Sequence, residues 1–560
     1  MKRWKRLLAA EIITFIYVVL VWRFLGIYFE TNDDRCITEI LSGIITVEPD
    51  GHVLHINYLL ASLFAGLYRI TDGIPWYGGG LILFHWQCYA FILDSVWEQF
   101  ESIGCRVAAA IASLLLFMAH IYIFTQIEFT SAAILMAATG YVCLILQNDR
   151  KKKAGLFIAF ELLAFLLRSE SMLVVQPLGM AVFAGTVLLE QESLRVRVKR
   201  IAGAAAALGL VFFVGVCGNL AGFHSQEWKE YQRYNRARVQ LMDYYGIPQY
   251  EDVKDILDNY HVTREQYAGF ANYAILDKDM PTECLEELAA YVQQGVQRNI
   301  NPAELFKMRV SLGLQNGSWS INRLSTLLIL AVIVYFLILK EYGTLLPLAF
   351  LGAADFIVWG YLLIQGRMPR RVVLPLFLAE TLFLICLMLW TRKRRKGGMF
   401  PQKWAGALIS IAVSAFCVFI IGQECPEVKR MNRGQMVYFE GMYELQDYCN
   451  LNSSNKYLIE ANSQSYYTGS ALETKIYRER NSIITGCWYS TSPSMQNKTE
   501  EYLSDCENGF YFIIMDDGDV WSRPAMQYMV ARRGGVKPEL TDTLEASNGL
   551  KYNIYYFENK

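Results

Sequence analysis

The chain has 560 residues, of which 54% are hydrophobic and 19% are charged. Soluble globular domains are on average less apolar and more highly charged, so the composition favours an integral membrane protein. The net charge of −1 at pH 7 provides no basic field for nucleic acid, and we expect no nucleic-acid partner.

Hydrophobic segments long enough to cross a bilayer recur along the chain. The first, from Leu7 to Phe29, is too long for a signal-peptide core and lacks a small-residue cleavage site, so we interpret it as a retained span. Further spans are expected at 76–94, 106–124, 130–147, 154–168, 172–190, 200–222, 321–340, 343–364, 372–391 and 405–422. The sequence therefore predicts a polytopic α-helical membrane protein with about eleven spans.

A shorter apolar stretch, 57–70, decides how these spans are oriented. Its length of about fourteen residues suits a helix lying on the membrane surface better than a crossing. Lys and Arg residues collect on the cytoplasmic side of membrane proteins. The basic clusters that flank the spans are at 2–6, 150–153, 195–200 and 392–396. They share one side only if 57–70 stays at the surface.

This arrangement predicts a multi-pass membrane protein with a cytoplasmic N-terminus. The segments then expected outside are 30–75, 125–129, 168–171, 223–320, 365–371 and 423–560. They divide the chain into a membrane module (1–222), an external helical insertion (223–320), further spans (321–422) and an extracytoplasmic domain (423–560). We base the insertion on its helical spacing of apolar residues.

The last segment, 423–560, predicts a small α/β domain. It combines a helical pattern at 430–449 with β-rich runs at 456–460, 482–489, 509–515 and 551–557. Its four cysteines, Cys425, Cys449, Cys487 and Cys506, would pair in one of three ways if they form disulfides. No Cys or His spacing in the chain indicates a metal site, so we predict no cofactor, although an acidic pair can bind a divalent cation.

Asp33 and Asp34 follow the first span on the expected external side. A carboxylate held at the membrane face can act as the general base for an acceptor hydroxyl, or orient it. The alternative is that the pair only caps the following helix. Glu128, in the external turn at 125–131, brings a second carboxylate to the same face, where the alternative is a polar turn residue.

Two histidines and an arginine are further candidates at this face. His52 and His55 lead into the surface segment 57–70, and Arg168 ends a span. We include all three as candidate ligands for the phosphate group of a lipid-linked donor substrate. The alternatives are polar anchoring for the histidines, and snorkelling or pairing with Glu170 for the arginine.

The external turn at 365–371 holds Arg367, Arg370 and Arg371 on the side where positive charge should be scarce. Arginine binds phosphate through two parallel hydrogen bonds. This cluster is therefore a candidate site for the phosphate of a lipid-linked donor, with generic contact to lipid head groups as the alternative.

With these motifs in place, residues 1–390 resemble the GT-C superfamily of polyprenyl-phosphate-dependent glycosyltransferases, of the protein mannosyltransferase and aminoarabinose transferase types. The features that carry the resemblance are Asp33-Asp34, the surface segment 57–70, Glu128 and the turn G-R-x-P-R-R-x-x-L-P at 366–375. The loop sequences also resemble uncharacterised membrane proteins of Gram-positive bacteria, and this resemblance implies a location in the bacterial plasma membrane. The insertion at 223–320 departs from the commoner pattern of the superfamily.

The resemblance implies that Asp33 or Asp34 is the base or positions the acceptor, and that Glu128 assists. It also implies that the arginines of the late external turn engage the donor phosphate. The implied partners are a polyprenyl-phosphate-linked sugar, the lipid bilayer and an extracytoplasmic glycan or protein acceptor.

Two other functions are open at this point. A transporter or flippase would use charged residues along a substrate path, and Glu161 and Asp355 are acids within spans. Most charges lie in loops at one face, however, whereas transport sites tend to lie near the midplane. A non-catalytic scaffold for cell-envelope assembly would use the two external segments as binding modules.

Overall fold

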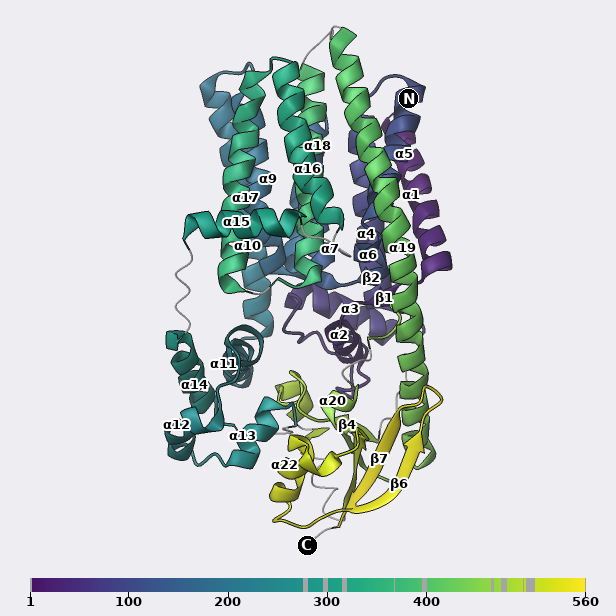
Figure 1. The fold of residues 1–560 in the computed structure, drawn as a ribbon, viewed down its shortest axis with the longest axis vertical. Helices are drawn as coiled ribbons and strands as arrows, with labels where there is room; N and C mark the ends of the chain where they lie inside the picture. Colours follow the sequence, from purple (N-terminus) through teal and green to yellow (C-terminus); the bar gives the residue numbers. More distant parts are fainter. Residues whose placement is uncertain are drawn as a thin grey trace.

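The structure is a computed structural model, and Figure 1 shows an elongated molecule with a helical bundle at one end and a mixed lobe at the other. It describes residues 3–274, 280–295, 301–314, 320–366, 368–394, 400–464, 468–474, 481–496, 498–499 and 509–558. The N-terminus lies at the free end of the bundle, and the C-terminus lies in the lobe.

The bundle consists of long apolar helices. They are α1 (Arg3–Leu25), α4 (Trp76–Trp97), α5 (Ile103–Ala119), α7 (Phe129–Leu146), α8 (Arg150–Leu167), α9 (Ser169–Leu188), α10 (Leu194–Gly222), α16 (Ser320–Ile338), α17 (Leu345–Gln365), α18 (Arg370–Arg394) and α19 (Phe400–Leu451). Among the described residues, eight helical segments are long and apolar enough to cross a membrane. Helix α7 is buried along its whole length and forms the centre of the bundle. The chain is therefore a multi-pass helical membrane protein, as the sequence predicts.

Two predicted spans have different bounds in the structure. The span expected at 106–124 is divided, because α5 ends before His120 and a short helix, α6 (Ile121–Thr125), follows it. The span expected at 405–422 runs on without a break into the helix expected at 430–449, so that α19 has 52 residues. The polar stretch between them ends the hydrophobic pattern, but its Glu, Lys, Arg and Met residues favour the helix.

The four basic clusters lie together at the free end of the bundle. The contacts that join them are the ion pairs Arg3–Asp149 at 2.5 Å, Arg150–Glu192 at 2.6 Å and Arg200–Glu192 at 3.0 Å, and a hydrogen bond from Lys393 to Asn148. This is the arrangement that the charge pattern predicts. That this end faces the cytoplasm remains a prediction from the positive-inside rule.

Helix α3 (Tyr58–Ile70) lies at the opposite end of the bundle, beside α2 (Asn32–Ser42) (Figure 1). The backbone N–H of Asn57, which precedes α3, donates to the carbonyl of Leu166 near the end of α8 at 2.8 Å. Tyr77, which follows α3 along the chain, donates to the carboxylate of Asp34 at 2.8 Å. Both ends of α3 thus lie at one end of the bundle, and the helix does not cross it.

The insertion is helical, as predicted. Its elements are α11 (Gln226–Val239), η1 (Gln240–Tyr245), η2 (Tyr250–Asp252), α12 (Lys254–Asn259), α13 (Arg264–Ala271), α14 (Thr282–Gly295) and α15 (Pro302–Leu314). Helix α15 lies across the bundle rather than along it (Figure 1). Its Arg309 pairs with Asp355 at 3.1 Å and with Glu380 at 3.0 Å, which holds α15 against α17 and α18.

The C-terminal lobe contains a five-stranded sheet in the order β4-β3-β5-β7-β6. The strands are β3 (Tyr457–Ile459), β4 (Ser482–Ile484), β5 (Phe510–Met515), β6 (Glu539–Glu545) and β7 (Lys551–Phe557), with the short helices α20 (Ala461–Gln464), η5 (Val520–Ser522) and α22 (Pro524–Arg532) between them. Strands β3, β4 and β5 are parallel, and β7 runs antiparallel to β5. The sequence predicts four of the five strands. It misses β6 because this edge strand is polar and mostly exposed.

Where the structure describes them, the cysteines of the last predicted segment form no disulfides with one another. They are Cys425, Cys449 and Cys487. Cys506 lies outside the described residues, so a pairing that includes it stays a prediction.

The segment 468–474 joins the lobe to the bundle. The N–H of Phe29 donates to the carbonyl of Gly469 at 3.1 Å, and the N–H of Ala471 donates to the carbonyl of Ile27 at 3.1 Å. Gly78, in α4, packs against this segment so closely that a Cβ atom there would lie 1.8 Å from the oxygen of Ala471. The lobe is therefore held directly against the loop that follows the first helix.

We predict that Gly78→Ala lowers the thermal stability of the purified protein, whereas Gly79→Ala does not. A Cβ atom on Gly78 meets backbone, which cannot rotate away, and overpacking of this kind costs about 1–3 kcal/mol. A Cβ atom on Gly79 meets nothing within 4 Å, and alanine favours the helix. Equal melting temperatures for the two variants would contradict this packing.

Candidate active site

Two short strands bring the acidic loops together. Strand β1 (Tyr28–Phe29), after the first helix, pairs in parallel with β2 (Gln126–Ile127), before α7. The residues that follow the strands are Glu30 and Glu128, and the N–H of Glu30 donates to the carbonyl of Ile127 at 3.2 Å. Because the two strands are parallel, their C-terminal ends lie side by side, and so do the two glutamates that follow them.

Glu128 is fully buried and caps helix α7. Its carboxylate accepts hydrogen bonds from the N–H groups of Thr130 at 2.6 Å and Ser131 at 3.0 Å, and from the hydroxyl of Thr130 at 2.5 Å. Burial raises the pKa of Glu128, and the charge of Arg371 opposes that rise. Its role in holding the start of the central helix is clear from these contacts, and it also places a carboxylate inside the site.

Asp33 and Asp34 lie in the first turn of α2 and differ in exposure. Asp34 is fully buried and accepts hydrogen bonds from the hydroxyls of Tyr77 at 2.8 Å and Thr31 at 3.1 Å. Burial raises the pKa of Asp34 well above its ordinary value, and the nearby charge of Glu128 raises it further. Asp33 is only partly buried. The cap residue of α2 is Thr31, and its side chain makes no capping bond. Of the two aspartates, Asp33 is the one whose carboxylate a substrate can reach.

Arg371 connects the late external turn to this acidic group. Its Nε lies 3.9 Å from Oε1 of Glu128. Its guanidinium interacts electrostatically with four carboxylates, which in decreasing order are those of Glu128, Asp33, Glu30 and Asp34. Residues more than 230 positions apart in the sequence therefore converge on one site at the end of the bundle opposite the basic clusters.

Of the other two arginines of the turn, the structure describes only Arg370. The guanidinium of Arg370 lies 5.6 Å from the ring centre of Tyr122, a cation–π distance. The hydroxyl of Tyr122 reaches Glu30 at 3.4 Å. Arg370 thus borders the same acidic group, while Arg367 lies outside the described residues.

Glu30 is a site residue that the sequence analysis does not single out. Burial raises its pKa to about 8, and the charge of Glu128 adds to that rise, whereas Arg371 and Arg370 lower it. Its position three residues before Asp33 is the only signal in the sequence. Its proximity to Glu128 depends on the pairing of β1 with β2, which two-residue strands do not reveal by pattern.

The raised pKa predicts a pH-dependent effect of Glu30→Gln on stability. The neutral acid is favoured in the fold, so the wild-type protein loses stability as pH rises from the ordinary value of 4.5 through about 8. Glutamine stays neutral, and the variant should be spared that loss. We expect the melting temperatures to agree near pH 4.5 and the variant to melt higher above pH 8. A constant difference across this range would contradict a titrating Glu30.

His55 and Arg168 lie together beside Glu128. Arg168 donates to Nδ1 of His55 at 3.0 Å, pairs with Glu170 at 3.2 Å, and stacks over the ring of Phe129 at 5.3 Å. Because an arginine can only donate, the proton of the neutral histidine sits on Nε2, which has no hydrogen-bond partner among the described residues. Burial lowers the pKa of His55 to about 4, so it presents a neutral N–H donor rather than a cation.

His52, by contrast, makes contacts that stabilise the fold. Its Nδ1 bonds to Asp50 at 2.6 Å, its Nε2 lies 3.2 Å from the carbonyl of Gly222, and its ring stacks on Trp228 at 4.6 Å. Both ring nitrogens have hydrogen-bond partners. Neither partner is one of the candidate catalytic carboxylates, Asp33, Asp34 and Glu128. The polar-anchor interpretation describes these contacts.

No three His, Cys, Asp or Glu side chains of the described ranges are grouped so that they could hold a metal ion. Asp355 and Glu161, the span acids considered for a transport path, are both bonded to other side chains. Asp355 pairs with Arg309 at 3.1 Å, and Glu161 accepts from Gln176 at 2.8 Å. These contacts tie helices together.

Comparisons with known proteins do not identify the family of this chain. No protein-family model matches the chain, and no curated protein matches it. A match among solved structures is the crystal structure of ArnT from Cupriavidus metallidurans bound to undecaprenyl phosphate. The two share 10% identity over 97% of each chain, with a TM-score of 0.36. A likeness at this level supports no conclusion about this chain, so its site is judged on its own geometry.

Proposed function

We propose that the protein is a membrane glycosyltransferase of the GT-C type, which moves a sugar from a polyprenyl-phosphate carrier to an extracytoplasmic acceptor of the cell envelope. The observation that carries this proposal is the convergence of Asp33, Glu128 and Arg371 at one end of a membrane bundle. Transfer from a phosphate leaving group requires a reachable carboxylate and a guanidinium in one site.

The transfer is a single displacement. The carboxylate of Asp33 accepts the proton of the acceptor hydroxyl, and the oxygen forms a bond to the anomeric carbon of the sugar. The bond from that carbon to the phosphate oxygen breaks, and its electron pair leaves with the polyprenyl phosphate. The configuration at the anomeric carbon is inverted.

The remaining groups hold the reactants. Asp34 is bonded to Tyr77 and supports the first turn of α2, which carries Asp33. Arg371, with Arg370 beside it, would stabilise the charge that develops on the departing phosphate. The free N–H of His55 would donate to a hydroxyl or phosphate oxygen of the bound substrate.

A transfer assay tests the proposal. The full chain is reconstituted in liposomes with radiolabelled sugars linked to undecaprenyl phosphate, the lipid named for the ArnT structure, and with solubilised envelope material as acceptor. We expect free undecaprenyl phosphate and labelled envelope material to appear together. A transporter or flippase would move the lipid-linked sugar across the bilayer intact, and a scaffold would leave it unchanged. Either result would refute the proposal.

A further inference from the structure

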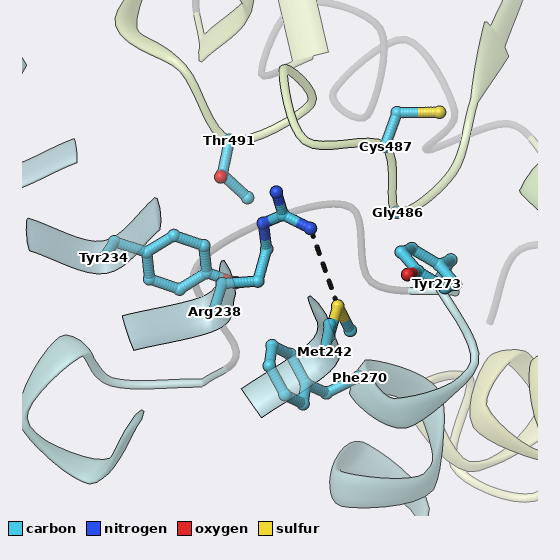
Figure 2. A pocket seen from close by; sticks show the side chains of 8 residues that line it. All are labelled: Tyr234, Arg238, Met242, Phe270, Tyr273, Gly486, Cys487 and Thr491. Carbon is cyan, nitrogen blue, oxygen red and sulfur yellow. Dashed lines mark hydrogen bonds between the residues drawn. The ribbon is translucent and has the colours of Figure 1, made fainter. Parts of the chain in front are cut away.

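A second site lies between the helical insertion and the C-terminal lobe. Helices α11, η1 and α13 form one wall, and the loop that contains Gly486, Cys487 and Thr491 forms the other (Figure 2). The hollow is small and partly open to solvent.

Arg238, from α11, extends across this pocket (Figure 2). Its exposed fraction is only 8%, and no carboxylate of the described residues forms an ion pair with it. Its Nε donates to Asn235 at 3.0 Å, and one Nη donates to the sulfur of Met242 at 3.6 Å. A guanidinium has five N–H donors, so three remain for a ligand.

A buried charge without a counter-charge is unfavourable. The other buried arginines of the described residues each have a carboxylate partner: Arg6 with Asp94 at 2.6 Å, Arg35 with Glu39 at 3.0 Å and Arg309 with Asp355 at 3.1 Å. The partners of Arg238 are a neutral amide and a thioether, which do not compensate its charge. An anion that enters from the open side of the pocket would compensate it.

The pocket adjoins the candidate active site through the loop that contains Cys487. The next residue, Trp488, packs edge-on against the ring of His55, with the ring centres 4.8 Å apart. Asp33 and Arg238 both act electrostatically on His55, Tyr273 and Cys487. Tyr273 and Cys487 line the pocket, and His55 lies beside Glu128's helix α7, stacked on Phe129 at 5.7 Å. A ligand held by Arg238 would therefore extend toward the carboxylate that we assign as the base.

We propose that the Arg238 pocket binds an anionic group, a carboxylate or phosphate, on the acceptor, so that the acceptor substrate is an acidic molecule of the cell envelope. This inference rests on the proposed function, because it assigns the acceptor side of that reaction. The donor phosphate binds at Arg371, and the acceptor anion binds at Arg238.

Binding of small anions tests the pocket without any transfer. Inorganic phosphate and glucuronate are titrated into the purified full chain by calorimetry, with glucose as the neutral control. We expect saturable binding of at least one anion and none of glucose. Arg238→Gln should weaken that binding at least about tenfold, since hydrogen bonds to a charged group contribute about 1.5–3 kcal/mol. Arg236→Gln, an exposed arginine on the same helix, should bind as the wild type does.

Two outcomes overturn the inference: a wild-type protein that binds neither anion, or an Arg238→Gln variant that binds as tightly as the wild type. If Arg238→Gln does not fold, Thr491→Trp fills the pocket from a partly exposed position and should abolish binding with Arg238 in place. Retained binding in that variant would also overturn it. Anion binding without any sugar transfer would refute the proposed function alone, and transfer without anion binding would refute this inference alone.

Discussion

Replacing Asp33 by Asn should lower the rate of sugar transfer about 10²–10⁴-fold, the range that a general base contributes. Asn has the same shape but cannot accept the proton of the acceptor hydroxyl. Because Asp33 is only partly buried, we expect the variant to fold with an unchanged melting temperature. The measurement is the initial rate at saturating donor and acceptor, in the reconstituted system.

The matched control is Glu48→Gln, which removes a carboxylate from an exposed position of the same external loop. It should transfer at the wild-type rate. If Asp33→Asn also transfers at that rate, Asp33 is not the base. A variant of Asp34 cannot replace this test, because loss of its bond to Tyr77 would disturb the helix that carries Asp33.

Replacing Arg371 by Gln should lower kcat about 10²–10³-fold, the effect expected when one group that stabilises a developing negative charge is lost. The Michaelis constant for the lipid-linked donor should rise as well, because the guanidinium also holds the phosphate before transfer. Arg371→Lys should recover part of the rate, since it keeps the charge but loses the paired hydrogen-bond geometry.

Arg392→Gln is the control for this variant. Arg392 lies on the same helix, α18, at the opposite end, where its guanidinium is 4.5 Å from the ring centre of Phe100. The same substitution there should leave both kinetic constants unchanged. Equal effects of the two substitutions would mean that charge on α18 matters for folding or insertion only, and would remove Arg371 from the site.

Hydrophobicity and charge placement sufficed to predict the membrane framework. Each predicted span except 106–124, which is divided between α5 and α6, corresponds to one long helix. The surface position of 57–70, inferred from its short length and from the four basic clusters, agrees with the position of α3. These features depend on the chain's partition between water and lipid, which each segment determines largely by itself. The unbroken helix α19 was not predicted. Its hydrophobic pattern ends near residue 422, but residues that favour a helix continue beyond that point.

The site was only partly predictable. Asp33, Asp34 and Glu128 were placed at one face by sidedness, but their closeness depends on β1 and β2, which are two residues each. The different burial of Asp33 and Asp34 depends on Tyr77, which is distant in sequence. Such contacts are products of tertiary packing and leave no periodic signal.

Arg238 shows the same limit more strongly. In the sequence it is one of several basic residues in a polar helical segment, and nothing separates it from Arg236. Only the packing of the insertion against the C-terminal lobe buries one of the two and leaves the other exposed. His52 is the opposite case, since a candidate ligand in the sequence is occupied by structural contacts in the fold.

The central claim is that the donor phosphate binds between the arginine turn and the paired acidic loops. Photolabelling with an undecaprenyl phosphate analogue, whose reactive group is next to the phosphate, tests it directly. The labelled peptides, identified by mass spectrometry, should come from the regions around 28–34, 126–130 and 368–372, and unlabelled undecaprenyl phosphate should compete. Label confined to the helix faces around Glu161 and Asp355, or to the end with the basic clusters, would contradict the claim.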